Sequence, residues 1–183
     1  MLEVVRGSGH DYPTKYTALQ TIEAAPEVSS QNKASVAVAA LAEGWRASTN
    51  DVQLRITLAN MRKLSISMIN RYKSDDEEIY RLLERSYNQG IDSQEKLMAI
   101  AALASQGTDE SARRLSRYLM DLNSKRQTGN IRQEDEQLVR AVITAIGQNG
   151  RPIGRPALNA VMALDWTHAV KRLAEEAIRR IGN

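Results

Sequence analysis

The chain repeats one short pattern three times: AALAEG at residues 39–44, AALASQG at 101–107 and TAIGQNG at 144–150. Small and apolar residues at this density favour a helix, and glycine is the commonest residue directly after a helix. We therefore predict that Gly44, Gly107 and Gly150 end helices in equivalent positions of successive units. Gly107 and Gly150 are 43 residues apart, and repeats of two or three helices have periods of roughly 40–47 residues. Since such a unit cannot bury its apolar face alone, neighbouring units should stack into one elongated core.

The composition points to closely packed helices. Hydrophobic residues make up 42% of the 183 residues, but aromatic residues only 4%, and phenylalanine and cysteine are absent. A core of Leu, Ile, Val, Met and Ala suits helices better than a β-sandwich, and no segment alternates as a strand would. The absence of cysteine excludes disulfides, thiolate catalysis and cysteine metal ligands. We predict an all-α fold of eight or nine helices.

Most of these helices can be placed along the chain. Apolar residues recur at three- and four-residue steps, and polar caps precede many of the runs. Asn50 is the predicted cap of the long third helix, and Ser74–Glu77 is a predicted capping box. The helix over 74–90 is either part of a pair or an extra helix. The expected helices lie at about 13–25, 31–43, 50–71, 74–90, 92–106, 108–123, 135–149, 157–164 and 165–181.

Residues 1–12 lack periodicity, so we expect a flexible N-terminal arm followed by a single helical-repeat domain over 13–183. No apolar run approaches the roughly 18 residues that a membrane-spanning helix needs, and no leader peptide opens the chain. Two locations stay open: the cytoplasm, or an exported protein whose signal has been removed.

Residues that could carry chemistry are sparse. The two histidines, His10 and His168, lack the spacing of metal ligands, and no phosphate loop, dinucleotide fingerprint or nucleophile motif occurs. The acids of residues 75–78 lack the spacing of a calcium loop, and a helix start explains them. We therefore expect no enzyme activity, no cofactor and no metal.

Basic residues are concentrated at the C-terminal end. The net charge is +3, and residues 138–183 alone contribute +4. Glu175 and Glu176 lie four residues from basic neighbours on both sides, which indicates a solvated face of paired charges. The paired residues would be Lys171–Glu175, Arg172–Glu176, Glu175–Arg179 and Glu176–Arg180. The same cations could instead bind phosphates, but aromatic residues for base stacking are missing.

The helix-pair period, the Ala/Leu-rich helices and the tail VKRLAEEAIRRI at 170–181 together resemble HEAT-type α-solenoid repeats over residues 31–183. The proline and Asp/Arg marks of regular HEAT units are degenerate here. The resemblance implies stacked antiparallel helix pairs that form a non-catalytic scaffold for protein–protein interaction.

In such solenoids the second helices line the concave face, where arginines can bind carboxylates of a partner. The candidate contact residues are Arg55, Arg62, Arg113 and Arg117. Pairing of Arg113 and Arg117 with Asp109, Glu110 or Asp121 is the simpler alternative. We expect a protein partner, and neither nucleic acid nor a small-molecule substrate. The rival function is an anion-binding module that uses the arginines on nucleic acid or a membrane surface. Arginines outnumber lysines 18 to 7, which suits recognition of carboxylates as much as of phosphates.

Overall fold

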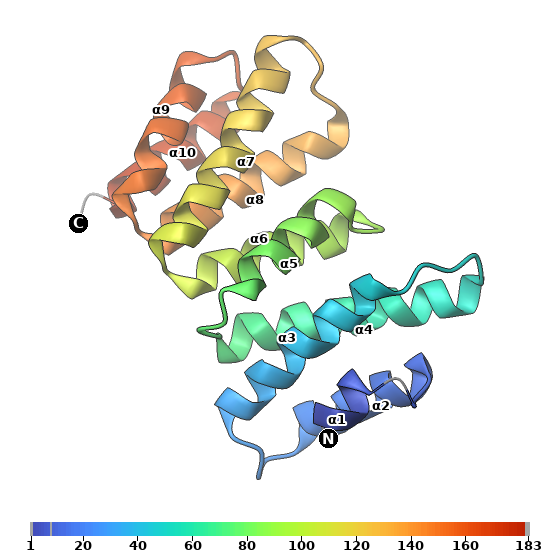
Figure 1. The fold of residues 1–183 in the computed structure, drawn as a ribbon. Coiled ribbons are helices and arrows are strands. Elements are labelled where there is room, and N and C mark those ends of the chain that lie inside the picture. The colour runs from blue at the N-terminus through green and yellow to red at the C-terminus, as the bar shows by residue number, and fades with distance from the viewer. Residues whose placement is uncertain (1, 8, 182–183) are drawn as a thin grey trace. The chain divides into compact units, whose positions relative to one another are not determined.

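The computed structural model describes residues 2–7 and 9–181, and this part of the chain is all-helical, without strands (Figure 1). It contains ten α-helices, where the sequence predicts eight or nine. The helices are α1 (Leu2–Arg6), α2 (Tyr12–Ala24), α3 (Ser30–Arg46), α4 (Val52–Tyr72), α5 (Glu78–Gln89), α6 (Ser93–Gln106), α7 (Asp109–Gln127), α8 (Gln133–Asn149), α9 (Arg155–Ala163) and α10 (His168–Ile181), with a 3-10 helix, η1 (Pro152–Gly154), before α9.

The chain divides into two compact units, Met1–Met98 and Ala99–Asn183, and the division falls within α6. Each unit has its own buried core. The single domain over 13–183 stays a prediction.

The helix that the sequence does not predict is α1, which lies in the segment expected to be a flexible arm. It packs on α2 and α3, and Val5 is fully buried. The sequence missed α1 because five helical residues are too few to show a period. The prediction of an arm without regular structure is therefore wrong for residues 2–6.

In the first unit, α3 and α4 form an antiparallel pair joined by a five-residue loop (Figure 1). Helix α2 packs against both, and α5 packs on α3. The core side chains are aliphatic, as the composition predicts, and almost all of their surface is removed from water. The largest of them include Leu19, Leu41, Met61, Ile66, Ile69, Leu82 and Leu83.

In the second unit, α7 packs on α8, η1 and α9, and α10 packs on α8 and α9. The buried row of α7 consists of Leu115, Leu119 and Leu122. Trp166 lies just before α10, and its indole N–H donates to the side-chain oxygen of Asn123 at 2.9 Å. Trp166 therefore connects the start of α10 to α7.

Local capping explains several helix starts. Asp11 accepts from the backbone N–H of Thr14 at the start of α2, and Thr108 and Ser111 form a capping box at the start of α7. At α4 the cap is Asp51, which accepts from the N–H of Leu54 at 2.9 Å. The predicted cap, Asn50, is one residue too early, a shift typical of helix boundaries.

The predicted capping box at Ser74–Glu77 is wrong. Helix α5 begins at Glu78, and the Glu77 side chain makes no capping hydrogen bond. Instead, Ser74 accepts from the N–H of Asp76, and Asp76 accepts from the N–H of Glu78. These short polar side chains bond to nearby backbone groups outside a helix, which competes with the capping geometry.

Two of the three repeated glycines end helices as predicted. Gly107 follows α6 with φ +64°, and Gly150 follows α8 with φ +74°, a left-handed conformation that favours glycine. Gly44 is different, because α3 continues through it to Arg46. The equivalence predicted for all three is therefore wrong at Gly44, and the reason lies in its contact with α4.

Candidate functional site

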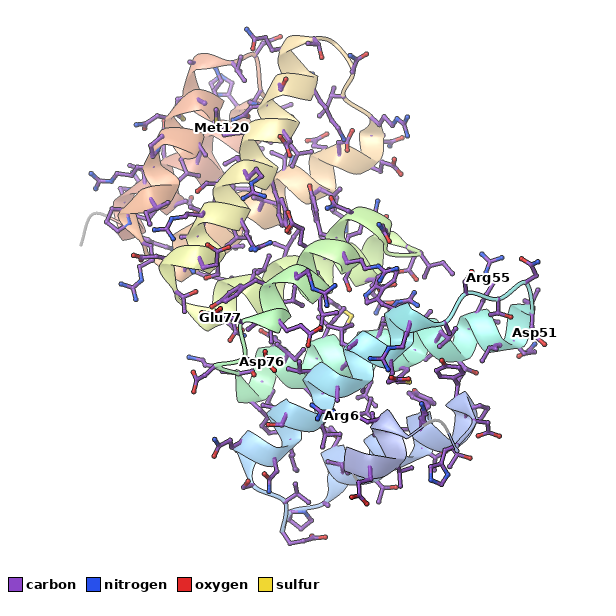
Figure 2. The ribbon with its side chains drawn as sticks, in the orientation of Figure 1. Arg6, Asp51, Arg55, Asp76, Glu77 and Met120 are labelled. Atoms are coloured by element: carbon purple, nitrogen blue, oxygen red, sulfur yellow. The ribbon has the colours of Figure 1, made fainter. Side chains whose placement is uncertain are left out.

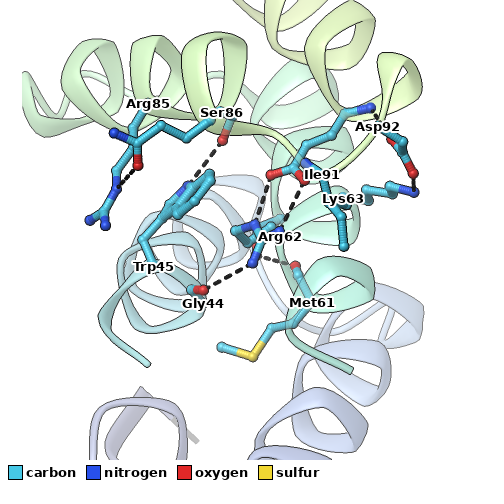
Figure 3. Close-up of polar contacts among 12 residues, drawn as sticks. Gly44, Trp45, Met61, Arg62, Lys63, Arg85, Ser86, Ile91 and Asp92 are labelled. Carbon is cyan, nitrogen blue, oxygen red and sulfur yellow. Dashed lines mark hydrogen bonds and ion pairs between the residues drawn. The ribbon is translucent and has the colours of Figure 1, made fainter. Parts of the chain in front are cut away.

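Arg62 is one of the four candidate contact residues, and the structure places it inside the first unit. Its side chain forms a bidentate ion pair with Glu95, with Nε and Nη2 at 2.7 and 3.1 Å from the two carboxylate oxygens. Nη1 donates to the carbonyl of Gly44 at 3.2 Å (Figure 3). Arg62 is 7% exposed and Glu95 0%. The expectation that Arg62 projects toward a partner is therefore wrong.

Trp45 extends this buried cluster. Its ring lies between two guanidinium groups, with the Arg62 and Arg85 carbons 4.2 and 4.8 Å from the ring centre (Figure 3). Its indole N–H donates to the Ser86 hydroxyl at 3.1 Å. Cation–π contacts of this kind strengthen when they are removed from water. The cluster thus ties α3, α4, α5 and the start of α6 together.

The Arg62 side chain also explains why residue 44 is glycine. A Cβ at this position would lie 2.6 Å from Cγ of Arg62, closer than van der Waals contact allows. Because glycine has no Cβ, α3 can approach α4 closely at this point. This approach brings the Gly44 carbonyl within hydrogen-bond distance of Arg62. Its role is packing rather than ending the helix.

We predict that Gly44→Ala lowers the free energy of unfolding by about 1–3 kcal/mol, the usual effect of overpacking, although alanine is the better helix former. The matched control is Gly9→Ala, since no atom lies within 4 Å of a Cβ at Gly9. Urea denaturation followed by circular dichroism measures both. Equal stability of the two variants would contradict the packing role.

The cluster also holds the loop between α5 and α6. Glu95 accepts from the backbone N–H of Ile91 at 3.2 Å, and the backbone N–H of Glu95 donates to Asp92 at 2.8 Å. Asp92 pairs with Lys63 of α4. Burial opposes ionisation of Asp92, but hydrogen bonds from Lys63 and from the Glu95 N–H outweigh it and hold the pKa of this carboxyl below its usual value. Arg62 and Glu95 therefore act as positioning residues for Ile91.

Arg55 lies on the outside of the first unit, near the start of α4 (Figure 2). Within the described chain its side chain has neither an ion-pair nor a hydrogen-bond partner. It lines a hollow of about 180 Å³ whose other residues are Ala47, Ser48, Thr49, Leu58, Arg62 and Ile91. Arg55 is thus an exposed cation at the edge of a small depression.

Three aliphatic side chains of the first unit are exposed. Val52 is 64% exposed, Ile56 47% and Ile91 49%. Val52 and Ile56 are one turn apart on α4 and flank Arg55, while Ile91 lines the hollow with it. We call the residues Val52, Arg55, Ile56 and Ile91, with loop 47–49, the Arg55 surface.

The other two candidate residues lie on α7 in the second unit. Arg113 and Arg117 are both exposed, as predicted. Arg113 is 3.7 Å from Glu110, which is the intrahelical pairing that the sequence left open. Met120 lies on the same side of α7 and is 49% exposed (Figure 2).

The charges of α10 do not pair as the sequence predicts. Across the described residues of this helix, none of the four expected pairs between positions 171 and 180 comes within ion-pair distance. His168, Lys171 and Arg172 instead line a hollow of about 450 Å³ with Met162, Ala169 and Glu175. The outer face of α10 therefore carries cations without carboxylate partners in the helix.

Comparison with protein-family models, curated proteins and solved structures finds no match to this chain. In the part of the chain that the structure describes, no three histidine or acidic side chains come together as a metal site would require. Over the same residues, no helix has the length and apolar character needed to cross a bilayer. The functional case therefore comes from the surfaces themselves.

Sequence reasoning missed Glu95, Ile91 and Val52. Glu95 looked like an ordinary acid in the first turn of a helix, and its partner lies 33 positions earlier. A signal was present at Arg62, which falls on the four-residue step from Leu58 to Ile66. A single arginine within an apolar row predicts a buried cation, and a buried cation needs a carboxylate.

Proposed function

We propose that this protein is a non-catalytic helical-repeat scaffold of HEAT-like architecture that binds a protein partner. The packing within each unit supports the architecture, because the main helix–helix contacts join helices that are one or two apart in sequence, as in stacked repeats. The resemblance of residues 31–183 to HEAT-type repeats points to the same class.

The Arg55 surface carries the proposal of protein binding. Arg55 has no ion-pair or hydrogen-bond partner within the described chain, and it lines the hollow together with the exposed side chain of Ile91. Arginine is enriched in protein interfaces, and the buried centre of an interface is more apolar than the rest of the surface. Arg113, Arg117 and Met120 are exposed on one side of α7 and form a second, smaller group of arginine and apolar side chains.

A second candidate function is anion binding on nucleic acid or a membrane surface. The unpaired cations of α10 favour it, since Lys171 and Arg172 line a hollow with His168. The mixed composition of the Arg55 surface favours the protein partner, because phosphates offer nothing for Val52, Ile56 and Ile91 to contact.

We predict that Arg113→Ala combined with Arg117→Ala leaves folding intact and weakens capture of the partner from an extract of the source cells by about fivefold or more. Both side chains are exposed, so circular dichroism and thermal unfolding should not change. Arg179→Ala, an exposed arginine on α10, is the matched control and should capture the partner normally. Unchanged capture by the double variant would remove α7 from the interface.

Salt separates the two candidate functions. Binding through many phosphate contacts falls by about 10³–10⁵-fold between 50 and 200 mM salt. A protein interface with a few arginines and an apolar centre should weaken far less. A steep salt dependence that is lost in Lys171→Ala and Arg172→Ala variants would support anion binding and contradict the scaffold.

A further inference from the structure

We propose that the Arg55 surface binds an extended acidic segment of the partner, with one carboxylate on the Arg55 guanidinium and a neighbouring aliphatic side chain against Leu58 and Ile91 in the hollow. This inference rests on the proposed function and specifies the chemistry of its ligand.

The charge around the hollow selects a carboxylate. Two cations line the hollow, and one of them, Arg62, is already paired with Glu95. The nearest acid in sequence is Asp51, the N-cap of α4, whose side chain accepts from the backbone N–H of Leu54. Arg55 is left as the uncompensated charge, and its planar donor fork matches a carboxylate in a bidentate geometry.

The size of the hollow favours a side chain over a free small molecule. Pockets for small ligands usually hold about 300–1,000 Å³, whereas this hollow measures about 180 Å³ and is open to solvent. Leu58 forms an apolar wall, and Ile91 and Arg55 stand at the edge. An aliphatic side chain next to the acid would lie in the hollow against Leu58 and Ile91.

The loop beside the hollow suits an extended backbone. Ser48 and Thr49 line the hollow, and Thr49 accepts from the N–H of Asp51. The backbone N–H groups of Ser48, Thr49 and Asn50 make no hydrogen bond to the rest of the described chain. They can therefore donate to the carbonyls of a segment that lies along the loop, as in recognition by strand addition.

The hollow is also held rigidly before binding. Ile91 is fixed by Glu95, and the α3–α4 approach is fixed by the Arg62 contact with Gly44. A site that is ordered beforehand loses less entropy on binding. This rigidity makes the surface suited to a short segment rather than to a large flat interface.

The experiment selects peptides of twelve random residues, displayed on phage, against the full chain. We expect enrichment of peptides with Asp or Glu next to Leu, Ile or Val. A selected peptide should bind Arg55→Glu about tenfold to a hundredfold more weakly, because a charged hydrogen bond is lost and a like charge is added. Ile91→Asp tests the apolar contact and should weaken binding by a similar factor. Arg179→Glu is the charge-matched control on α10 and should bind normally.

The outcomes separate this inference from the function on which it rests. Peptides that are basic, or that bind Arg55→Glu as well as the original chain, would overturn the acidic segment while leaving protein binding in place. Selected peptides whose binding depends on Arg113 and Arg117 would move the site to α7 and likewise overturn it. Failure to select any peptide, together with steep salt-dependent binding to anionic vesicles or nucleic acid, would overturn the proposed function itself. Circular dichroism of each variant distinguishes lost binding from lost folding.

Discussion

Replacing Glu95 by alanine should lower the free energy of unfolding by about 3–5 kcal/mol, the usual effect of removing one partner of a buried ion pair. Arg62 would keep its charge in a site where it is 7% exposed, and its remaining polar contact would be the Gly44 carbonyl. The backbone N–H of Ile91 would also lose its acceptor. Chemical denaturation followed by circular dichroism measures the change.

Two controls isolate the buried charge as the cause. Glu78→Ala removes an ion pair with Arg81 that is largely exposed, so it should change stability by about 0–1 kcal/mol. The double variant Arg62→Met with Glu95→Leu removes both charges and should recover most of the lost stability, because apolar residues of similar volume can replace a buried pair. A double variant as unstable as Glu95→Ala would show that packing, rather than an unpaired charge, controls the effect.

The same pair connects stability with the proposed binding. Because Glu95 holds Ile91, a loss of the pair should also loosen the edge of the hollow beside Arg55. In the proposed site Arg62 would act from inside the unit, by holding Glu95 beside Ile91, whereas the sequence predicts direct contact with the partner. Only Arg55 among the two α4 candidates is placed to make that contact.

Local features of the fold could be predicted from the sequence, since periodicity and capping act over a few residues. The all-α class and most helices follow from these signals, as do the left-handed glycines after α6 and α8. Gly44 shows the limit. It carries the same local pattern as Gly107, but its function depends on Arg62, which approaches from another helix, and no local signal encodes that approach.

Only part of the candidate site could be predicted, because the sequence pattern indicates exposure but not contacts between distant segments. Exposure of Arg55, Arg113 and Arg117 follows from their places outside the apolar rows of α4 and α7. The Arg55 surface itself requires Ile91, which reaches the hollow from a loop that Glu95 positions. Sequence spacing could not place this side chain beside Arg55, because the two residues come together only through the folded unit.

The second large effect is expected at Trp166, which is 6% exposed in the second unit. Trp166→Ala should lower the free energy of unfolding by about 3–5 kcal/mol, because it removes a large packed ring and leaves a cavity. It also removes the donor to Asn123, a side chain that is 3% exposed and that itself donates to the Ala157 carbonyl at 3.2 Å. Denaturation with and without the substitution measures the sum of these losses.

Trp166→Phe separates the two contributions. Phenylalanine keeps most of the apolar contact but cannot donate, so the Asn123 oxygen would be buried without a partner, at a cost of about 1–3 kcal/mol. Asp165→Ala, at the fully exposed neighbouring position, is the matched control and should leave stability unchanged. If Trp166→Phe were as stable as the original chain, the hydrogen bond to Asn123 would contribute nothing, and the effect of Trp166→Ala would come from packing alone. If Trp166→Phe were as unstable as Trp166→Ala, the hydrogen bond to Asn123 would account for the whole effect and would be the contact that holds the start of α10 on α7.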